Sequence, residues 1–115
     1  MNTHAGRKLS RPTGARFALL RGMATSLLKH EQVRTTLAKA REVSRFAERL
    51  LSVAKRKNLT AYREVSATVA DKEVRKKIYD VLVPRYQSRP GGCTRVHRTG
   101  TRRGDGAEMA VIQLV

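Results

Sequence analysis

Aromatic residues and cysteine are scarce in this sequence, and tryptophan is absent. The 115 residues include two phenylalanines, three tyrosines and one cysteine, Cys93. With 40% hydrophobic residues and so few aromatic ones, the core must be built mainly from aliphatic side chains. A single cysteine cannot form an intrachain disulfide or a metal site made of several thiolates, which fits a reducing compartment.

Long apolar runs are missing as well. None approaches the roughly 20 residues that cross a bilayer, so we expect no transmembrane helix. The first residues lack the apolar region of a secretory signal peptide, although a basic start without acids is also typical of transit peptides. The length suits one domain with a core of its own.

Acidic residues are few and unevenly placed. The chain has 25 lysines and arginines against 9 acids, for a formal net charge of +16. All acids except Asp105 and Glu108 lie between Glu31 and Asp80. At this charge density, self-repulsion destabilises a compact chain unless a polyanion neutralises it. Nucleic acid is therefore the first candidate partner, and an anionic membrane surface is the second.

The motifs of common enzymes and metal sites are also absent. The sequence contains neither GxxxxGK[ST] nor HExxH. His4, His30 and His97 have no cysteine or carboxylate at metal-ligand spacing, so we predict no metal site. Cys93 and His97 are close in sequence, but this spacing alone does not make a catalytic dyad. We therefore predict no enzyme activity, no cofactor and no small-molecule substrate.

Hydrophobic periodicity predicts an α+β fold with a single domain over residues 13–115, preceded by an extended basic N-terminal arm over residues 1–12. Apolar residues recur at helical spacing from Phe17 to Leu28 and again over residues 37–57, 58–69 and 71–83. We expect Pro84 to end the last of these helices near Val83. The pattern thus predicts about four helices.

Three other segments have the character of strands. Residues 32–36 are rich in β-branched side chains, residues 94–99 follow a Pro-Gly-Gly turn, and residues 109–115 alternate in hydropathy. We expect the last two to form a hairpin with a long loop. Together with residues 32–36 they make a small sheet of about three strands, packed against the helices because amphipathic helices need an apolar partner.

Basic residues group into several candidate contact regions for nucleic acid. They are the N-terminal arm (Arg7, Lys8, Arg11), the exposed side of the first helix (Arg16, Arg21, Lys29), Arg34 and Lys39, and the C-terminal segment (Arg85, Arg89, Arg95, Arg98, Arg102, Arg103). Arginine predominates in the last region, and its planar guanidinium binds phosphate through two hydrogen bonds. Tyr86 is the only aromatic residue near this segment, which favours recognition of a folded backbone over stacking on single-stranded bases.

Two basic features allow a second interpretation. The N-terminal arm is equally consistent with a frayed terminus that contacts nothing. Arg41, Arg45 and Arg49 lie one turn apart on the second predicted helix. They form either a solvated face balanced by Glu42 and Glu48 or a secondary ridge that faces phosphates.

Seven short segments together carry a resemblance to a known family. They are GRKLSR at 6–11, MATSLLKHE at 23–31, VRTTLAKARE at 33–42, PRY at 84–86, RPGGCTRV at 89–96, RGDG at 103–106 and MA at 109–110. In this order they resemble the bacterial large-subunit ribosomal protein seventeen family over nearly the whole chain. The family usually has more basic residues just after Met1 and an aromatic residue after the Gly-Gly pair, where this chain has Asn2, Thr3 and Cys93.

The resemblance implies a structural role without catalysis. A member of that family is expected to bind 23S ribosomal RNA on the large subunit, near the exit of the peptide tunnel. It implies a cytoplasmic ribosomal location, neighbouring large-subunit proteins as partners and no association with a membrane.

Two other functions are consistent with the composition. One is a DNA-compacting architectural protein, which co-sedimentation with ribosomal subunits would distinguish. The other is a small RNA-processing enzyme. The absence of paired carboxylates or a His/Lys constellation argues against the enzyme, and RNA that stays intact after long incubation would exclude it.

The C-terminal basic segment leads to a test of its role. Each phosphate contact contributes about 0.7–0.9 to the slope of log affinity against log salt concentration. Replacing Arg102 and Arg103 with alanine should therefore flatten this slope in a binding titration with RNA. An unchanged slope would remove these two residues from the contact surface.

Overall fold

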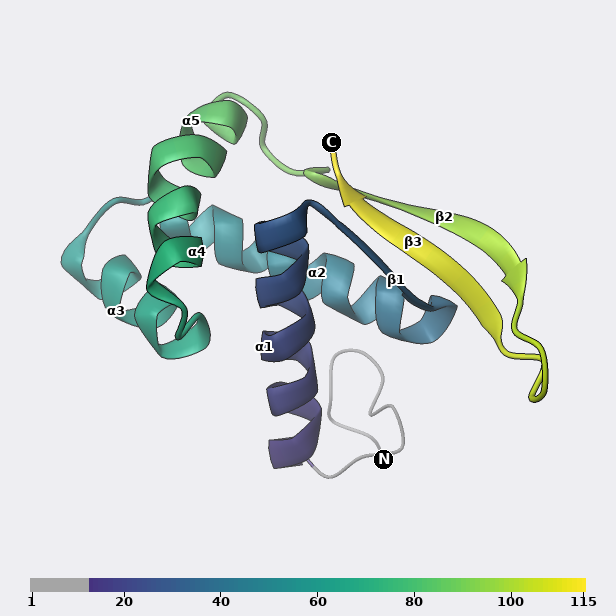
Figure 1. Ribbon diagram of the computed structural model, residues 1–115. Helices are drawn as coiled ribbons and strands as arrows, with labels where there is room; N and C mark the ends of the chain where they lie inside the picture. Colours follow the sequence, from purple (N-terminus) through teal and green to yellow (C-terminus); the bar gives the residue numbers. More distant parts are fainter. Residues whose placement is uncertain (1–12) are drawn as a thin grey trace, which may run out of the picture.

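The computed structural model describes residues 13–115, which form helices and one antiparallel sheet (Figure 1). The elements are α1 (Thr13–His30), β1 (Gln32–Thr36), α2 (Leu37–Ala54), α3 (Leu59–Thr68), α4 (Lys72–Lys77), the π-helical turn η1 (Ile78–Leu82), α5 (Val83–Tyr86), β2 (Thr94–Thr101) and β3 (Glu108–Leu114). Because α4, η1 and α5 are continuous, they form one helical unit. The α+β class with about four helices and three strands is confirmed. The predicted arm, residues 1–12, lies outside the described residues.

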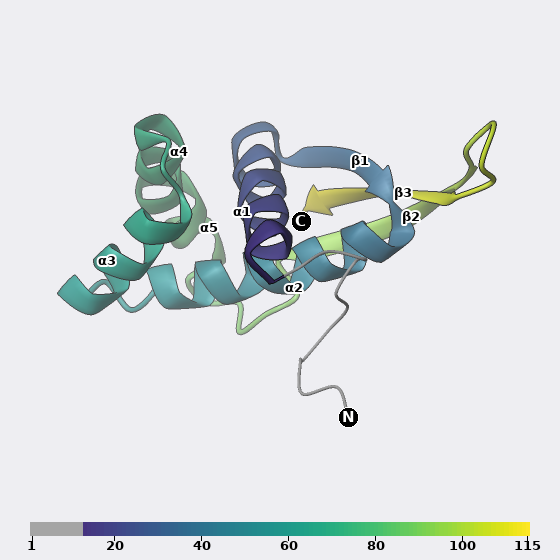
Figure 2. The ribbon, with the colours of Figure 1, turned by 90° about the horizontal axis from the view of Figure 1, so that it is seen from below.

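The sheet places the last strand of the chain in its centre. The strand order is β1-β3-β2, and both pairings are antiparallel. The predicted hairpin of β2 and β3 is confirmed, and it extends away from the helices (Figure 1). In Figure 2, α1 and α2 lie beside the sheet, whereas α3, α4 and α5 gather at the opposite end of the molecule.

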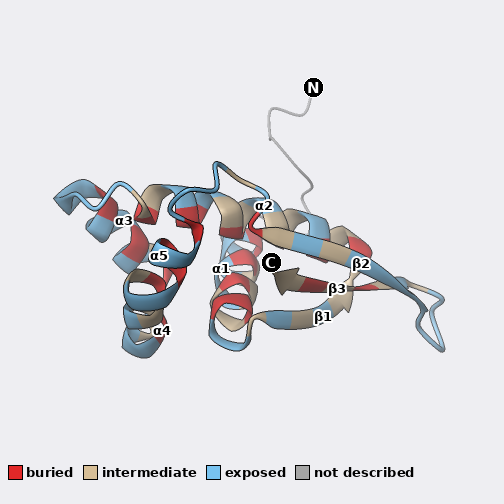
Figure 3. Ribbon diagram, turned by 90° about the horizontal axis from the view of Figure 1, so that it is seen from above, coloured by how far each residue is buried: buried red, intermediate tan, exposed pale blue. Residues whose placement is uncertain are grey.

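Aliphatic side chains fill two adjoining clusters, as the composition predicts. One lies between α1, α2 and the inner face of the sheet, and it includes Leu27, Val43 and Ile112. The other joins α2 to α3, α4 and α5, and it includes Leu51 and Ile78. Burying each large aliphatic side chain contributes about 1.5–3 kcal/mol to folding. The buried stripe along α2 borders both clusters (Figure 3), so this helix is the common wall of the core.

The first turns of α1 differ from the prediction. Arg16 was expected on the exposed side of this helix, but it is buried, with an exposed fraction of 6%. It lies four residues before Leu20 and eight before Ala24, so helical periodicity puts it on the same stripe as these core residues. Phe17, expected in the apolar face, is 43% exposed, and the Arg16 guanidinium lies 5.1 Å from the centre of its ring.

Pro84 does not end the last helix, contrary to the prediction. In an α-helix, the ring of Pro84 would clash with the carbonyl group four residues earlier. That carbonyl would also lose its hydrogen bond, because proline has no N–H to donate. Here Ile78–Leu82 forms a π-helical turn, and the Val83 N–H donates to the Ile78 carbonyl. The wider turn accommodates the ring. The helix therefore continues to Tyr86, whose hydroxyl donates to the Val115 carbonyl at 2.7 Å.

Glu31 connects the helices to the sheet. It follows α1 in a left-handed backbone conformation with φ of 64°. Its N–H donates to the Leu27 carbonyl at 2.7 Å, and its own carbonyl accepts from the Leu114 N–H at 2.9 Å. Its carboxylate accepts hydrogen bonds from Arg85 at 2.5 Å and from Lys77 at 3.0 Å. One residue thus joins the end of α1, the central strand and the last helical unit.

We predict that Glu31→Gln destabilises the protein in a pH-dependent way. Hydrogen bonds from Arg85 and then Lys77 hold the pKa of the Glu31 carboxyl below its ordinary value of 4.5. A lowered pKa means that the ion pairs stabilise the fold above about pH 4.5, and that this stabilisation is lost as the pH falls through the folded-state pKa. Because the carboxylate is partly exposed, two such pairs are worth about 0.5–2 kcal/mol.

Urea denaturation at pH 7 and pH 3 measures this difference in the free energy of unfolding. Glu31→Gln should be less stable than the parent at pH 7, and the difference should become smaller at pH 3. Glu64→Gln is the matched control, since Glu64 is an exposed carboxylate on α3 with no ion pair among residues 13–115. An equal loss at both pH values would assign the effect to packing or backbone strain instead.

Candidate nucleic-acid interface

The predicted contact residues are distributed over several surfaces of the described structure. Arg7, Lys8 and Arg11 lie outside the described residues, Arg16 is buried, and Lys39 is half-buried. The exposed ones are Arg21 and Lys29 on α1, Arg34 on β1, Arg85 on α5, Arg89 before β2, Arg95 and Arg98 on β2, and Arg102 and Arg103 in the hairpin loop. Exposure alone therefore does not single out one binding face.

Two of these arginines are engaged within the protein. Arg85 binds Glu31 at the junction described above. Arg102 binds Asp105 through two guanidinium nitrogens, with Nε donating to Oδ1 at 3.1 Å and Nη2 donating to Oδ2. The same carboxylate accepts from the Ala107 N–H at 3.1 Å. Hydrogen bonds from Arg102, and then from Ala107, lower the pKa of Asp105 to about 2, so the carboxylate stays charged.

Because Arg102 binds Asp105, the two arginines of the hairpin loop have different roles. Arg102 holds the loop in shape through Asp105. Arg103 is exposed and forms no ion pair within residues 13–115. Sequence reasoning treated them alike, because the Arg102–Asp105 contact depends on how the loop turns.

The face of the sheet turned away from α1 and α2 brings together residues that are distant in sequence. Register sets Arg34 opposite Val111 and Val111 opposite His97, and it sets Gln32 opposite Gln113 and Gln113 opposite Arg95. Directly opposed residues point to the same side of a sheet. We call these six residues the open face. The Gln113 Nε2 and His97 Nε2 atoms lie 3.2 Å apart.

Sequence reasoning found Arg34 and Arg95 but missed the glutamines and His97. Alternation along each strand was visible, but the register between strands was not.

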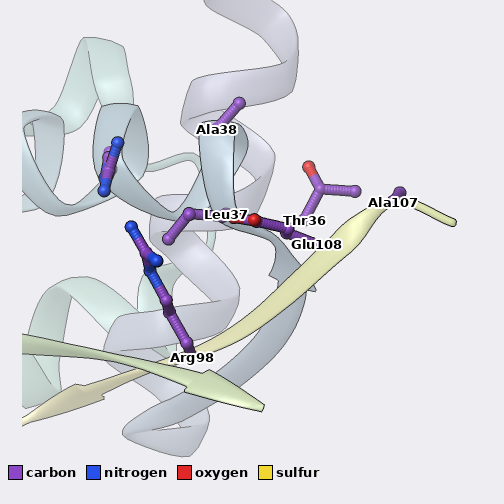
Figure 4. A pocket seen from close by; sticks show the side chains of 7 residues that line it. Thr36, Leu37, Ala38, Arg98, Ala107 and Glu108 are labelled. Atoms are coloured by element: carbon purple, nitrogen blue, oxygen red, sulfur yellow. The ribbon is translucent and has the colours of Figure 1, made fainter. Parts of the chain in front are cut away.

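A hollow lies on the other side of the sheet, where α2 begins (Figure 4). It has a volume of about 330 Å³ and is lined by Thr36, Leu37, Ala38, Arg41, Arg98, Ala107 and Glu108. In Figure 4, Arg98 extends from β2 toward the first turn of α2. Thr36 stands at the N-cap position, but its side chain makes no capping hydrogen bond there. Because Arg98 lines this hollow and Arg95 belongs to the open face, the two arginines lie on different sides of the sheet.

The ridge of Arg41, Arg45 and Arg49 does not present a uniform surface. All three residues are exposed. Arg41 lines the hollow beside Arg98, and Arg45 lies 4.0 Å from the Glu42 carboxylate. Arg49 borders a separate apolar groove with Phe17 and other residues. Different neighbours along the helix favour a solvated face with mixed contacts.

Cys93 and His97 are not brought together as a nucleophile and base. Cys93 is buried in the core with an exposed fraction of 2%, whereas His97 lies on the open face. Burial raises the pKa of the Cys93 thiol, which keeps it protonated and a poor nucleophile. Within residues 13–115, no group of three His, Cys, Asp or Glu side chains is placed to hold a metal ion. None of the described helices combines the length and hydropathy needed to cross a membrane.

Comparison with known proteins identifies relatives over almost the whole chain. Residues 19–115 match the family described as "Ribosomal protein L17". The "Large ribosomal subunit protein bL17" of Syntrophobacter fumaroxidans is 51% identical over 111 residues, covering 96% of this chain and 74% of the relative. The protein of the same name from Clostridium acetobutylicum is 46% identical, with 95% and 96% covered. That from Myxococcus xanthus is 50% identical, with 95% and 78% covered.

The extent of these matches decides the family. The family match spans far more than half of the chain, and the relatives share about half of their aligned residues with it. The resemblance that the seven segments indicated is confirmed, and the chain belongs to the ribosomal protein L17 family.

Proposed function

We propose that this protein is a structural constituent of the large ribosomal subunit that binds 23S ribosomal RNA through phosphate contacts near the exit of the peptide tunnel. Membership of the L17 family carries the assignment to the large subunit. The formal charge of +16 supports an RNA partner, because a polyanion relieves the self-repulsion of the folded chain. The partners are ribosomal RNA and neighbouring large-subunit proteins, in the cytoplasm. The proposed role includes no catalysed reaction.

Guanidinium groups that have no internal ion pair supply the binding. Arg34, Arg89 and Arg95 are exposed and form no ion pair with the acids of residues 13–115. Each can donate two parallel hydrogen bonds to a phosphate. Each contact also releases counterions from the RNA, which makes affinity fall with salt. Arg85 and Arg102 serve mainly to hold the scaffold, since Glu31 and Asp105 already bind them.

We predict that the full chain co-sediments with the large ribosomal subunit. A tagged copy expressed in a bacterial cell should appear in the large-subunit fraction of a sucrose gradient at moderate salt, because many phosphate contacts act together. Crosslinking of the same fraction should recover 23S RNA. A negative control is the same tag on a chain with Arg34, Arg89 and Arg95 replaced by glutamine, which should bind the subunit more weakly. Sedimentation with nucleoid DNA or the small subunit would contradict the proposal.

The loop arginines should differ in their effect on RNA binding. Arg103→Gln should lower the slope of log affinity against log salt by about 0.7–0.9, the value of one phosphate contact. Arg102→Gln should change the slope less, because Asp105 already neutralises Arg102. Fluorescence anisotropy over a salt series measures both. An equal decrease for the two variants would show that Arg102 leaves Asp105 to bind RNA.

A further inference from the structure

No helix among residues 13–115 covers the open face of the sheet (Figure 2). The opposite face packs on α1 and α2 through Ala110 and Ile112, which belong to the core cluster, and through Val33, which packs against that cluster. On the open face, Arg34, Arg95 and His97 are exposed, although Arg34 lies on β1 and the other two lie on β2, far along the chain. We infer that this face binds double-helical RNA across its minor groove. The inference rests on the proposed function and adds the surface and the form of RNA.

The charge on this face favours a phosphate backbone. None of its six residues is acidic, and neither arginine forms an ion pair with the acids of the described residues. The acids nearest to the sheet are directed elsewhere. Glu31 binds Lys77 and Arg85, Glu48 accepts hydrogen bonds from Thr94, and Glu108 lines the hollow at the start of α2. The open face therefore has two guanidinium groups available and no competing carboxylate.

The positions of the two arginines suit a broad groove. Arg34 and Arg95 lie on the two outer strands, with β3 between them, and their rows are offset by two residues. Strand spacing of about 4.8 Å and a rise of about 3.4 Å per residue place their Cα atoms about 12 Å apart. Long side chains extend this reach further. Two phosphates on opposite borders of one groove can thus be bound from the same face.

The groups between the arginines suit RNA. An A-form helix has a wide, shallow minor groove that displays 2′-hydroxyl groups, each a donor and an acceptor. Gln32 and Gln113 also carry donors and acceptors. Val111 offers a small apolar surface beside them, between Arg34 and His97. The six residues include no phenylalanine, tyrosine or tryptophan, so this face offers no aromatic ring on which single-stranded bases could stack. The face therefore favours RNA helices over single strands and over DNA.

A titration with defined nucleic acids tests the inference. The full chain is titrated with a 20-base-pair RNA duplex, the DNA duplex of the same sequence and one single strand of the RNA, over a salt series. The face variant is Arg34→Gln with Arg95→Gln. The control is Arg63→Gln with Lys72→Gln, which removes the same charge from exposed residues of α3 and α4. Circular dichroism melting verifies that both variants fold.

The parent should bind the RNA duplex more tightly than the other two ligands. The face variant should lower the salt slope for the RNA duplex by about 1.4–1.8, twice the contribution of one contact, and the control should change it much less. Gln32→Ala with Gln113→Ala keeps the charge and should reduce the preference for RNA over DNA. This variant separates 2′-hydroxyl contacts from general attraction.

Three outcomes would overturn the inference: equal effects of the face and control variants, equal affinity for RNA and DNA duplexes, or tighter binding of the single strand. The proposed function fails separately. A face variant that still enters the large subunit as well as the parent, and binds the RNA duplex unchanged, would reject the open face and retain the ribosomal role.

Discussion

The ion pairs of Glu31 with Arg85 and Lys77 hold together the three parts of this fold. The residue stands where α1 ends and β1 begins, and its backbone also binds the end of β3. The left-handed backbone of Glu31 costs about 1 kcal/mol or more for a residue other than glycine. The two cations offset part of that cost, which explains why an acid occupies a turn that glycine would fit.

Three of the few acids in this basic chain stabilise the fold by binding neighbouring side chains. Glu31 and Asp105 each bind a nearby arginine, while the carboxylate of Glu48 accepts a hydrogen bond from Thr94 at the start of β2. These contacts orient the segments that carry the remaining arginines. Because cations outnumber acids, most guanidinium groups within residues 13–115 have no carboxylate partner. The same imbalance that weakens the isolated fold favours binding to a polyanion, and such binding in turn stabilises the folded state.

The sheet depends on the last residues of the chain. β3 is central, so β1 has no strand partner until residues 108–114 are available. The hydroxyl of Tyr86 then binds the carbonyl of Val115, and the Val115 N–H binds the carbonyl of Cys93. Folding must therefore close a long loop before the pairing of β1 stabilises the structure. The open face also forms only at this stage, since two of its residues belong to β3.

The sequence by itself determined the class, the elements and the kind of partner. Apolar spacing located α2 and the helical segments that begin near Asn58 and Asp71, where the structure shows side-chain caps, and alternation identified the final strand. These signals are local and need no knowledge of neighbours.

Tertiary structure alone decided the strand order, the open face and the continuation of the helix past Pro84. Each depends on which distant segments meet. Net charge is a sum over residues, but a binding face depends on register and packing, which only the folded chain provides.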